Sequence, residues 1–482
     1  MQRVLTALVG ALTIGVLSSG VASAHDPRDE RPNRAMSPSG IHVPLVTSPG
    51  VRLVDNFPET QGISGEFAKT GDFFYVSSLD SISVFDTSDP LHPKLTGTLP
   101  NLVFENEAMT YGERKVDGEL KRFVLVGNDL YNVAVDPAAG PQRGRVGGGE
   151  VIVVDVTDET TPHVRARTPA AGAGTVTSST HTVQCLTAAC NFAYTAGDVG
   201  EFSIIDLRDL DNPVQIATAK SPASAPNAIF TRGSGHYWDF DAAGVGWHTG
   251  SGGSVAFDVS DPLAPKALNA TNEQGTATPW NDFIHHNSMR PNAGRFRAGS
   301  PSVRNGNVLL VTEEDYFNDG DELACERAGT FQTWRIPDLD GAAYRSGNPD
   351  LAPNAGTIEP LDLINPVALG DGLSTPVGGF CSAHWFDYHQ SGIIAQGYYQ
   401  QGLRLIDVRN ATDLRQYGYV TGGASEVWDA YFVPQRNRKG VATGKKTNVV
   451  YTADLVRGVD VYEVDLPGAD LSEDGPLPPI LP

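Results

Sequence analysis

Residues 150–162 read EVIVVDVTDETTP, a β-branched run that ends in aspartate and is followed by a turn. Variants of this phrase recur along the chain, and each joins a short strand-forming run to turn-forming residues. The clear copies are SISVFDTSDP at 81–90, FSIIDLRDLDNP at 202–213, SVAFDVSDPLAP at 254–265 and LRLIDVRNATDL at 403–414, and the weaker ones are TFQTWRIPDLD at 330–340 and VDVYEVDL at 459–466. Seven repeats of this size predict a propeller or a solenoid.

The spacing of the repeats favours a propeller. The aspartates that end three consecutive copies, Asp155, Asp206 and Asp258, lie 51 and 52 residues apart, which is the length of a four-stranded blade with modest loops. We therefore expect an all-β fold, a single closed seven-bladed β-propeller over residues 51–467.

The two ends of the repeat region indicate how the ring of blades closes. The seventh copy is followed by the proline-rich segment 466–482, which does not supply an outer strand. Residues 50–58, GVRLVDNFP, have the composition of that missing strand, so we expect this N-terminal strand to complete the last blade. The alternative is a linear array with an exposed edge, which native proteins avoid.

The repeated phrase resembles the LVIVD repeat, and the chain is similar to secreted seven-bladed propellers built from it. The resemblance covers roughly residues 51–467 and implies the fold. It implies almost nothing about function.

The N-terminus carries the features of a secretory signal. Residues 1–24 contain Arg3, an apolar run and the small residues VASA, which predict cleavage before His25 and a secreted, extracellular protein. The apolar run is too short for a membrane span. We expect a flexible linker over residues 25–49 and a proline-rich tail over residues 468–482.

The charge of the chain narrows the classes of molecule that it can bind. The chain has 57 acidic and 35 basic residues, a net charge of −22, which argues against nucleic acid and anionic membranes. We expect a monomer whose partner is a small molecule or a surface ligand. No P-loop, GxGxxG, GxSxG or HExxH motif is present.

Four cysteines fit an oxidising compartment. Cys185 and Cys190 bracket a tight reversal and are expected to pair. Cys325 and Cys381 then form the second disulfide. A cysteine metal cluster is the alternative, but the sequence has no C-x-x-C pair.

Four of the eleven histidines occupy one position in consecutive repeats, just before the two inner strands. Small residues usually precede them, and the position is held by His181, His236, His286 and His384; in the third of these repeats His285 is an alternative. Equivalent positions of neighbouring blades meet at the axis of a propeller. Neutral imidazoles there can bind one transition metal, with iron, copper and zinc as candidates. The alternative is that these histidines are polar channel residues.

Carboxylates and aromatic residues flank this histidine set. Glu107 and Glu426 hold the same position in the repeats on either side, where they can act as acid–base groups or orient the ligands. Aromatic residues next to the set are expected to keep the pocket dry: Tyr237, Trp238, Trp385 and Trp428. The pattern indicates a metal-dependent oxidoreductase. The alternative is a non-catalytic propeller that binds protein or glycan.

Three further features have weaker interpretations. His248 follows an apolar run and is expected at the surface or in a loop. The acidic segment EEDYFNDGDE at 313–322 is either a calcium loop or a solvated insertion, since it lacks the D-x-D-x-D-G order. A histidine amine at a cleaved N-terminus could bind copper through His25, although the following segment reads as a flexible linker.

Overall fold

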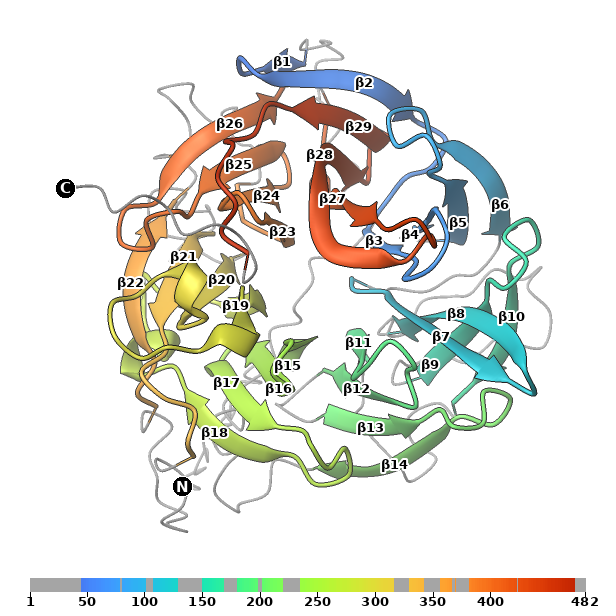
Figure 1. Cartoon of the computed structure of the whole chain (residues 1–482), viewed down its shortest axis with the longest axis horizontal. Helices are drawn as coiled ribbons and strands as arrows, with labels where there is room; N and C mark the ends of the chain where they lie inside the picture. Colours follow the sequence, from blue (N-terminus) through green and yellow to red (C-terminus); the bar gives the residue numbers. More distant parts are fainter. Residues whose placement is uncertain are drawn as a thin grey trace, which may run out of the picture.

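The computed structural model describes residues 45–78, 80–100, 107–128, 150–168, 180–197, 202–219, 235–315, 329–341, 356–365, 369, 381–422 and 424–472. These residues form seven antiparallel sheets arranged as blades around one axis (Figure 1). In blades one to five the strands are hydrogen-bonded in chain order from the innermost strand outwards, and in blades six and seven an N-terminal strand is added at the outer edge. The predicted all-β, seven-bladed propeller is therefore confirmed.

The first four blades follow one another in the chain. Blade one has β3 (Ser64–Phe67), β4 (Phe73–Ser77), β5 (Ser81–Asp86) and β6 (Lys94–Pro100). Blade two has β7 (Thr110–Val116), β8 (Glu119–Asn128), β9 (Glu150–Asp155) and β10 (His163–Arg167). Blade three has β11 (Thr182–Cys185), β12 (Phe192–Ala196), β13 (Phe202–Asp206) and β14 (Val214–Ala219). Blade four has β15 (Gly235–Phe240), β16 (Val245–Gly250), β17 (Gly253–Asp258) and β18 (Lys266–Ala270).

The last three blades complete the ring. Blade five has β19 (Ile284–Met289), β20 (Val308–Glu314), β21 (Phe331–Arg335) and β22 (Glu359–Ile364). Blade six has β23 (Phe386–His389), β24 (Ile393–Gly397), β25 (Leu403–Asp407) and β26 (Arg415–Thr421). Blade seven has β27 (Val427–Arg436), β28 (Ala442–Asp454) and β29 (Gly458–Val464). Among the described residues, short 3-10 helices lie in the connections at η4 (Glu273–Thr276), η5 (Ala293–Arg295) and η6 (Val303–Asn305). No helix in the described part of the chain is long and apolar enough to cross a membrane.

The N-terminal segment closes the ring. Strand β2 (Val51–Phe57) pairs antiparallel with β29, from Val51 opposite Val464 to Phe57 opposite Val459, and is the outer strand of blade seven. Strand β1 (Val46–Thr47) adds a fifth strand to blade six. The predicted completion of the last blade is confirmed, and the last residues of the segment expected to be a linker form a strand.

The outermost ends of the chain fall largely outside the described residues. This is true of the expected signal peptide at 1–24, of linker residues 25–44 and of tail residues 473–482. The described start of the tail lies against the ring, since Leu471 packs on the apolar cluster between blades five and six.

Apolar side chains hold neighbouring blades together. Seven clusters of buried residues each join two adjacent blades, and together they run around the whole ring. The cluster between blades seven and one, with Phe74 facing Tyr451, closes the circle. Burial of such side chains contributes most of the favourable free energy of folding.

The repeated aspartate has a structural role in five copies of the phrase. Its carboxylate accepts a hydrogen bond from the backbone N–H two residues later, at 2.8 Å from Ser88 to Asp86 and at 2.9 Å from Thr157 to Asp155. The same turn occurs at Asp206, Asp258 and Asp407. Such turns reverse the chain between the two outer strands, which is why the phrase predicts the fold rather than the chemistry.

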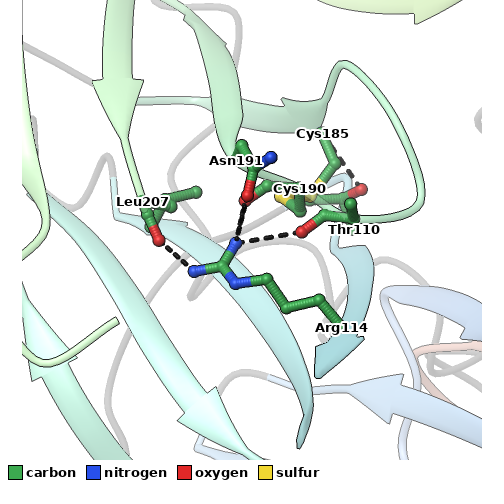
Figure 2. The surroundings of a disulfide bond; sticks show 7 residues. Thr110, Arg114, Cys185, Cys190, Asn191 and Leu207 are labelled. Atoms are coloured by element: carbon green, nitrogen blue, oxygen red, sulfur yellow. Dashed lines mark hydrogen bonds between the residues drawn. A yellow bond between two sulfur atoms is a disulfide. The ribbon is translucent and has the colours of Figure 1, made fainter. Parts of the chain in front are cut away.

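A disulfide fixes one hairpin of blade three, as predicted. Cys185 and Cys190 are bonded, with 4.9 Å between their Cα atoms. Figure 2 shows Arg114 of blade two beside this bond, where its guanidinium donates to the carbonyl oxygens of Cys190 (2.8 Å) and Leu207. Cys381 is also disulfide-bonded. Its expected partner, Cys325, lies outside the described residues.

Candidate metal centre

The innermost strands of four consecutive blades carry the predicted histidines to the axis. His181 immediately precedes β11, His236 lies in β15, His286 lies in β19, and His384 lies two residues before β23. The innermost strands of blades two to five contact their neighbours, β7 against β11, β11 against β15 and β15 against β19. Glu107 precedes β7 of blade two, so the five residues come from blades two to six.

All four imidazoles surround one oxygen of Glu107. The Nε2 atoms of His181, His236, His286 and His384 lie 2.9, 3.2, 3.5 and 3.5 Å from Glu107 Oε2. The Nε2 atoms of His181 and His236 are 2.9 Å apart. Two ligands at right angles on an ion, with bonds of about 2.1 Å, are separated by about 3 Å. The observed spacings therefore match those between neighbouring ligands of one metal ion.

A second carboxylate, which the sequence analysis missed, also reaches the axis. Glu314 ends β20, and its Oε2 lies 3.9 Å from Nε2 of both His236 and His286. Ligand atoms of Glu107, His236, His286 and Glu314 all lie within 4.8 Å of one another. Glu314 is the second residue of the acidic run that suggested a calcium loop, and its strand pairing with Ile284 brings it beside His286.

Bulges in the innermost strands accompany two of the histidines. The pairing of β15 with β16 shifts between Gly235 and Tyr237, which leaves His236 as the extra residue. The pairing of β19 with β20 shifts between His285 and Ser288, across His286. A bulge changes the direction in which a side chain points. These irregularities turn both imidazoles towards the axis.

The Nδ1 atoms of the rings face hydrogen-bond acceptors. His236 Nδ1 lies 2.8 Å from the carbonyl oxygen of His286. His384 Nδ1 lies 2.9 Å from the carbonyl oxygen of Trp428 and 3.0 Å from Asp429 Oδ1. Because these partners only accept, Nδ1 carries a proton in both rings, and in His236, whose ring is neutral, Nε2 presents its lone pair to the axis. This tautomer is the one that binds a metal through Nε2.

Further hydrogen bonds orient the residues around the axis. Tyr431 donates its hydroxyl proton to Asp429 Oδ2, so the carboxylate that accepts from His384 is itself held in place. The hydroxyl oxygen of Tyr431 accepts from the backbone N–H of Gly65 at 2.9 Å. Tyr399 donates to Glu314 Oε1, and the other oxygen of this carboxylate faces the histidines. Such outer contacts fix the position and basicity of metal ligands.

The cluster is removed from solvent. The side chains of the four histidines, Glu107 and Glu314 are at most 4% exposed. Burial, followed by the neighbouring His181, lowers the pKa of His236 to about 4, and burial also lowers the pKa of His286 well below its usual range. Neutral imidazole, the form that binds metals, is therefore favoured at both positions.

His384 lies in the strongest negative field. Burial lowers its pKa, but the charges of Glu107 and Asp429 outweigh burial and raise the pKa to about 10. Burial raises the pKa of Asp429 itself to about 6. Positive charge is thus stabilised at this point of the axis, whether a proton or a metal ion carries it.

The other residues expected at the site lie around the cluster. Glu426 accepts a hydrogen bond from the indole N–H of Trp428 at 3.1 Å. It does not belong to the group of four residues whose ligand atoms all lie within 4.8 Å of one another. The Trp428 ring packs edge-on against His384, with centroids 5.0 Å apart. Tyr237 and Trp385 meet at 4.7 Å from blades four and six. Trp238 instead belongs to the apolar cluster between blades three and four.

Some minor expectations need correction. His248 is not a surface residue: it lies within β16, 1% exposed, against the ring of Trp238. Burial lowers its pKa to about 3. His285 does not replace His286, because its nitrogens face Ser254 Oγ and the carbonyl oxygen of Trp280. Most of the acidic segment, residues 316–322, and His25 lie outside the described residues.

Comparison with solved structures supports the fold alone. The β-propeller domain of Cps50 (Swd1) from Myceliophteria thermophila superimposes with a TM-score of 0.52 at 12% identity, covering 86% of this chain and 100% of that one. The WD40 repeats of RRP9 give a TM-score of 0.47 at 8% identity, covering 88% and 100%. No family model matches the chain, and no curated protein matches it.

Proposed function

We propose that this protein binds one transition-metal ion at the axis of its propeller and acts as a metal-dependent oxidoreductase. The observation that carries the proposal is the convergence of four imidazole Nε2 atoms within 2.9–3.5 Å of Glu107 Oε2. The ligands would be His181, His236, His286 and His384 together with carboxylates of Glu107 and Glu314.

The types of ligand atom narrow the choice of metal ion. Imidazole nitrogens and carboxylate oxygens without sulfur suit iron, copper or zinc. Two carboxylates and four neutral imidazoles would balance the charge of a divalent ion, as a buried site requires. Iron or copper would supply one-electron chemistry there. Glu107, which faces all four imidazoles, is also the residue best placed to accept or return a proton, whereas Glu426 would act only through Trp428.

Elemental analysis of protein purified without chelators tests this proposal. We expect about one equivalent of iron, copper or zinc per chain, and removal of the metal should lower the thermal midpoint. A ligand present at a hundred times its dissociation constant stabilises the folded state by about 2.7 kcal/mol. Iron or copper would support the oxidoreductase, whereas zinc would restrict the site to Lewis-acid chemistry.

Absence of bound metal would contradict the proposed site. If the purified protein holds no metal and takes up none of the three ions in equilibrium dialysis, the metal site does not exist. The alternative function, a non-catalytic propeller that binds protein or glycan, would then account for the fold.

We also propose that the protein is an exported propeller of the LVIVD-repeat type. The repeated phrase, the composition of residues 1–24 and the Cys185–Cys190 disulfide support this. Mass spectrometry of protein recovered outside the producing cells should find a mature N-terminus at His25. Recovery of the full-length chain only inside the cells would contradict the proposal.

A further inference from the structure

Tyr399 has an unusual backbone conformation next to the axis. Its φ is 44°, in the left-handed region, although it is neither glycine nor asparagine. For a bulky residue this conformation is a genuine outlier and is energetically unfavourable. The residue is also completely buried. Strain of this kind persists only where the surrounding structure enforces it, and it is concentrated at functional sites.

Backbone hydrogen bonds enforce the conformation. The N–H of Tyr399 donates to the carbonyl oxygen of Val427 at 2.7 Å, and the N–H of Val427 donates back at 3.0 Å. The N–H of Gly402 donates to the Tyr399 carbonyl at 3.0 Å. The loop after β24 of blade six is thereby fastened to the start of β27 in blade seven.

The side chain reaches two of the proposed ligands. Its hydroxyl donates to Glu314 Oε1 of blade five. Its ring packs edge-on against His384 of blade six, with centroids 5.0 Å apart, and against Trp428 at 5.5 Å. One strained residue therefore contacts ligands from two blades and a residue from a third.

We propose that Tyr399 is a positioning residue that makes Glu314 a one-oxygen ligand. The inference rests on the proposed metal site. The tyrosine hydroxyl holds Oε1, so Oε2 alone faces His236 and His286, at 3.9 Å from each. A carboxylate that binds through one oxygen takes one coordination position rather than two. Tyr399 would thus limit Glu314 to one coordination position and prevent its second oxygen from displacing one of the imidazoles.

Replacement of Tyr399 by phenylalanine tests this directly, because Y399F removes one oxygen and keeps the ring. Cobalt(II), whose visible absorption reports coordination number, is the probe. We expect Y399F to change the cobalt spectrum and to weaken cobalt binding by about 10- to 100-fold, the usual effect of losing such an outer contact.

The adjacent residue provides a matched control. Tyr398 is equally buried, but its hydroxyl donates to the carbonyl oxygen of Gly329 at 2.6 Å and not to a proposed ligand. Y398F should therefore leave the cobalt spectrum and affinity unchanged. In an E314A background, Y399F should have no additional effect on the spectrum.

The possible outcomes separate the two proposals. If the wild-type protein binds no cobalt, iron, copper or zinc, the metal site and the role of Tyr399 both fail. If it binds cobalt and Y399F has the wild-type spectrum and affinity, only the role of Tyr399 fails. The same holds if Y399F changes the spectrum equally in the presence and absence of Glu314.

Discussion

Replacing His236 and His384 together by alanine is expected to abolish stoichiometric metal binding while the propeller remains folded. The two residues belong to blades four and six and face Glu107 Oε2 at 3.2 and 3.5 Å. Removing both takes away two of the four proposed imidazole ligands, so that water and buffer can enter the coordination sphere and compete with His181, His286 and the two carboxylates for the ion. Each blade keeps its own hydrogen-bonded strands, so the circular dichroism spectrum should not change. Metal content measured after gel filtration should fall from about one equivalent to less than a tenth.

A matched double variant controls for the loss of two buried rings. His285 and His389 likewise lie in two different blades, five and six, and are buried, but their nitrogens face Ser254, Trp280, Ser391 and the carbonyl oxygen of Lys446. H285Q/H389Q should retain its metal. If the axial double variant also retained a full equivalent, the ion would be bound elsewhere and the proposed centre would be wrong.

The fold could be predicted because the same strand-and-turn phrase occurs seven times along the chain. A turn such as that of Asp155 is defined by two residues close in sequence, and seven copies of the phrase require seven similar units. The closing strand could also be predicted, because β29 without β2 would be an exposed edge. Neither prediction needed any knowledge of how side chains are oriented.

The candidate site could be predicted only in part. The repeat register predicted that His181, His236, His286 and His384 meet at the axis, and their Nε2 atoms lie within 3.5 Å of Glu107 Oε2. Glu314 was missed since it ends a second strand rather than preceding a first one. Its position depends on the pairing of β19 with β20, which contains a bulge. Such an irregularity has no clear signal in the sequence.

The expectations for Trp238 and His248 were wrong for a related reason, because the orientation of their side chains depends on strand pairing. Trp238 was expected at the pocket because it lies two residues after His236. The bulge at His236 puts the indole instead in the apolar cluster between blades three and four. His248 was expected at the surface or in a loop because it was interpreted as the end of an outer strand, but β16 continues through it to Gly250. Local composition alone could not show which side of a strand faces the neighbouring blade.

A variant that begins at residue 59, and so lacks β1 and β2, is expected to aggregate rather than form a soluble open ring. Strand β2 gives Val51 and Leu53 to the apolar cluster between blades six and seven, and Val54 and Phe57 to the cluster between blades seven and one. Each fully buried apolar side chain of this size contributes about 1.5–3 kcal/mol. Partial burial of four of them amounts to several kcal/mol, a large share of the 5–15 kcal/mol by which proteins are usually stable.

Aggregation should result only from loss of β2, the strand that closes the ring. A variant that begins at residue 45 keeps β1 and β2 and should behave as a chain that begins at residue 25 does in size-exclusion chromatography and thermal unfolding. Because deletion leaves the edge of β29 without its partner, a synthetic peptide of residues 45–58 added during refolding should restore soluble monomer by strand addition. A monomeric variant beginning at residue 59 with the thermal midpoint of the variant beginning at residue 45 would show that the ring does not depend on its N-terminal strand. The clusters on both sides of blade seven would then have to be stable without Val51 and Phe57, contrary to the packing that the structure shows.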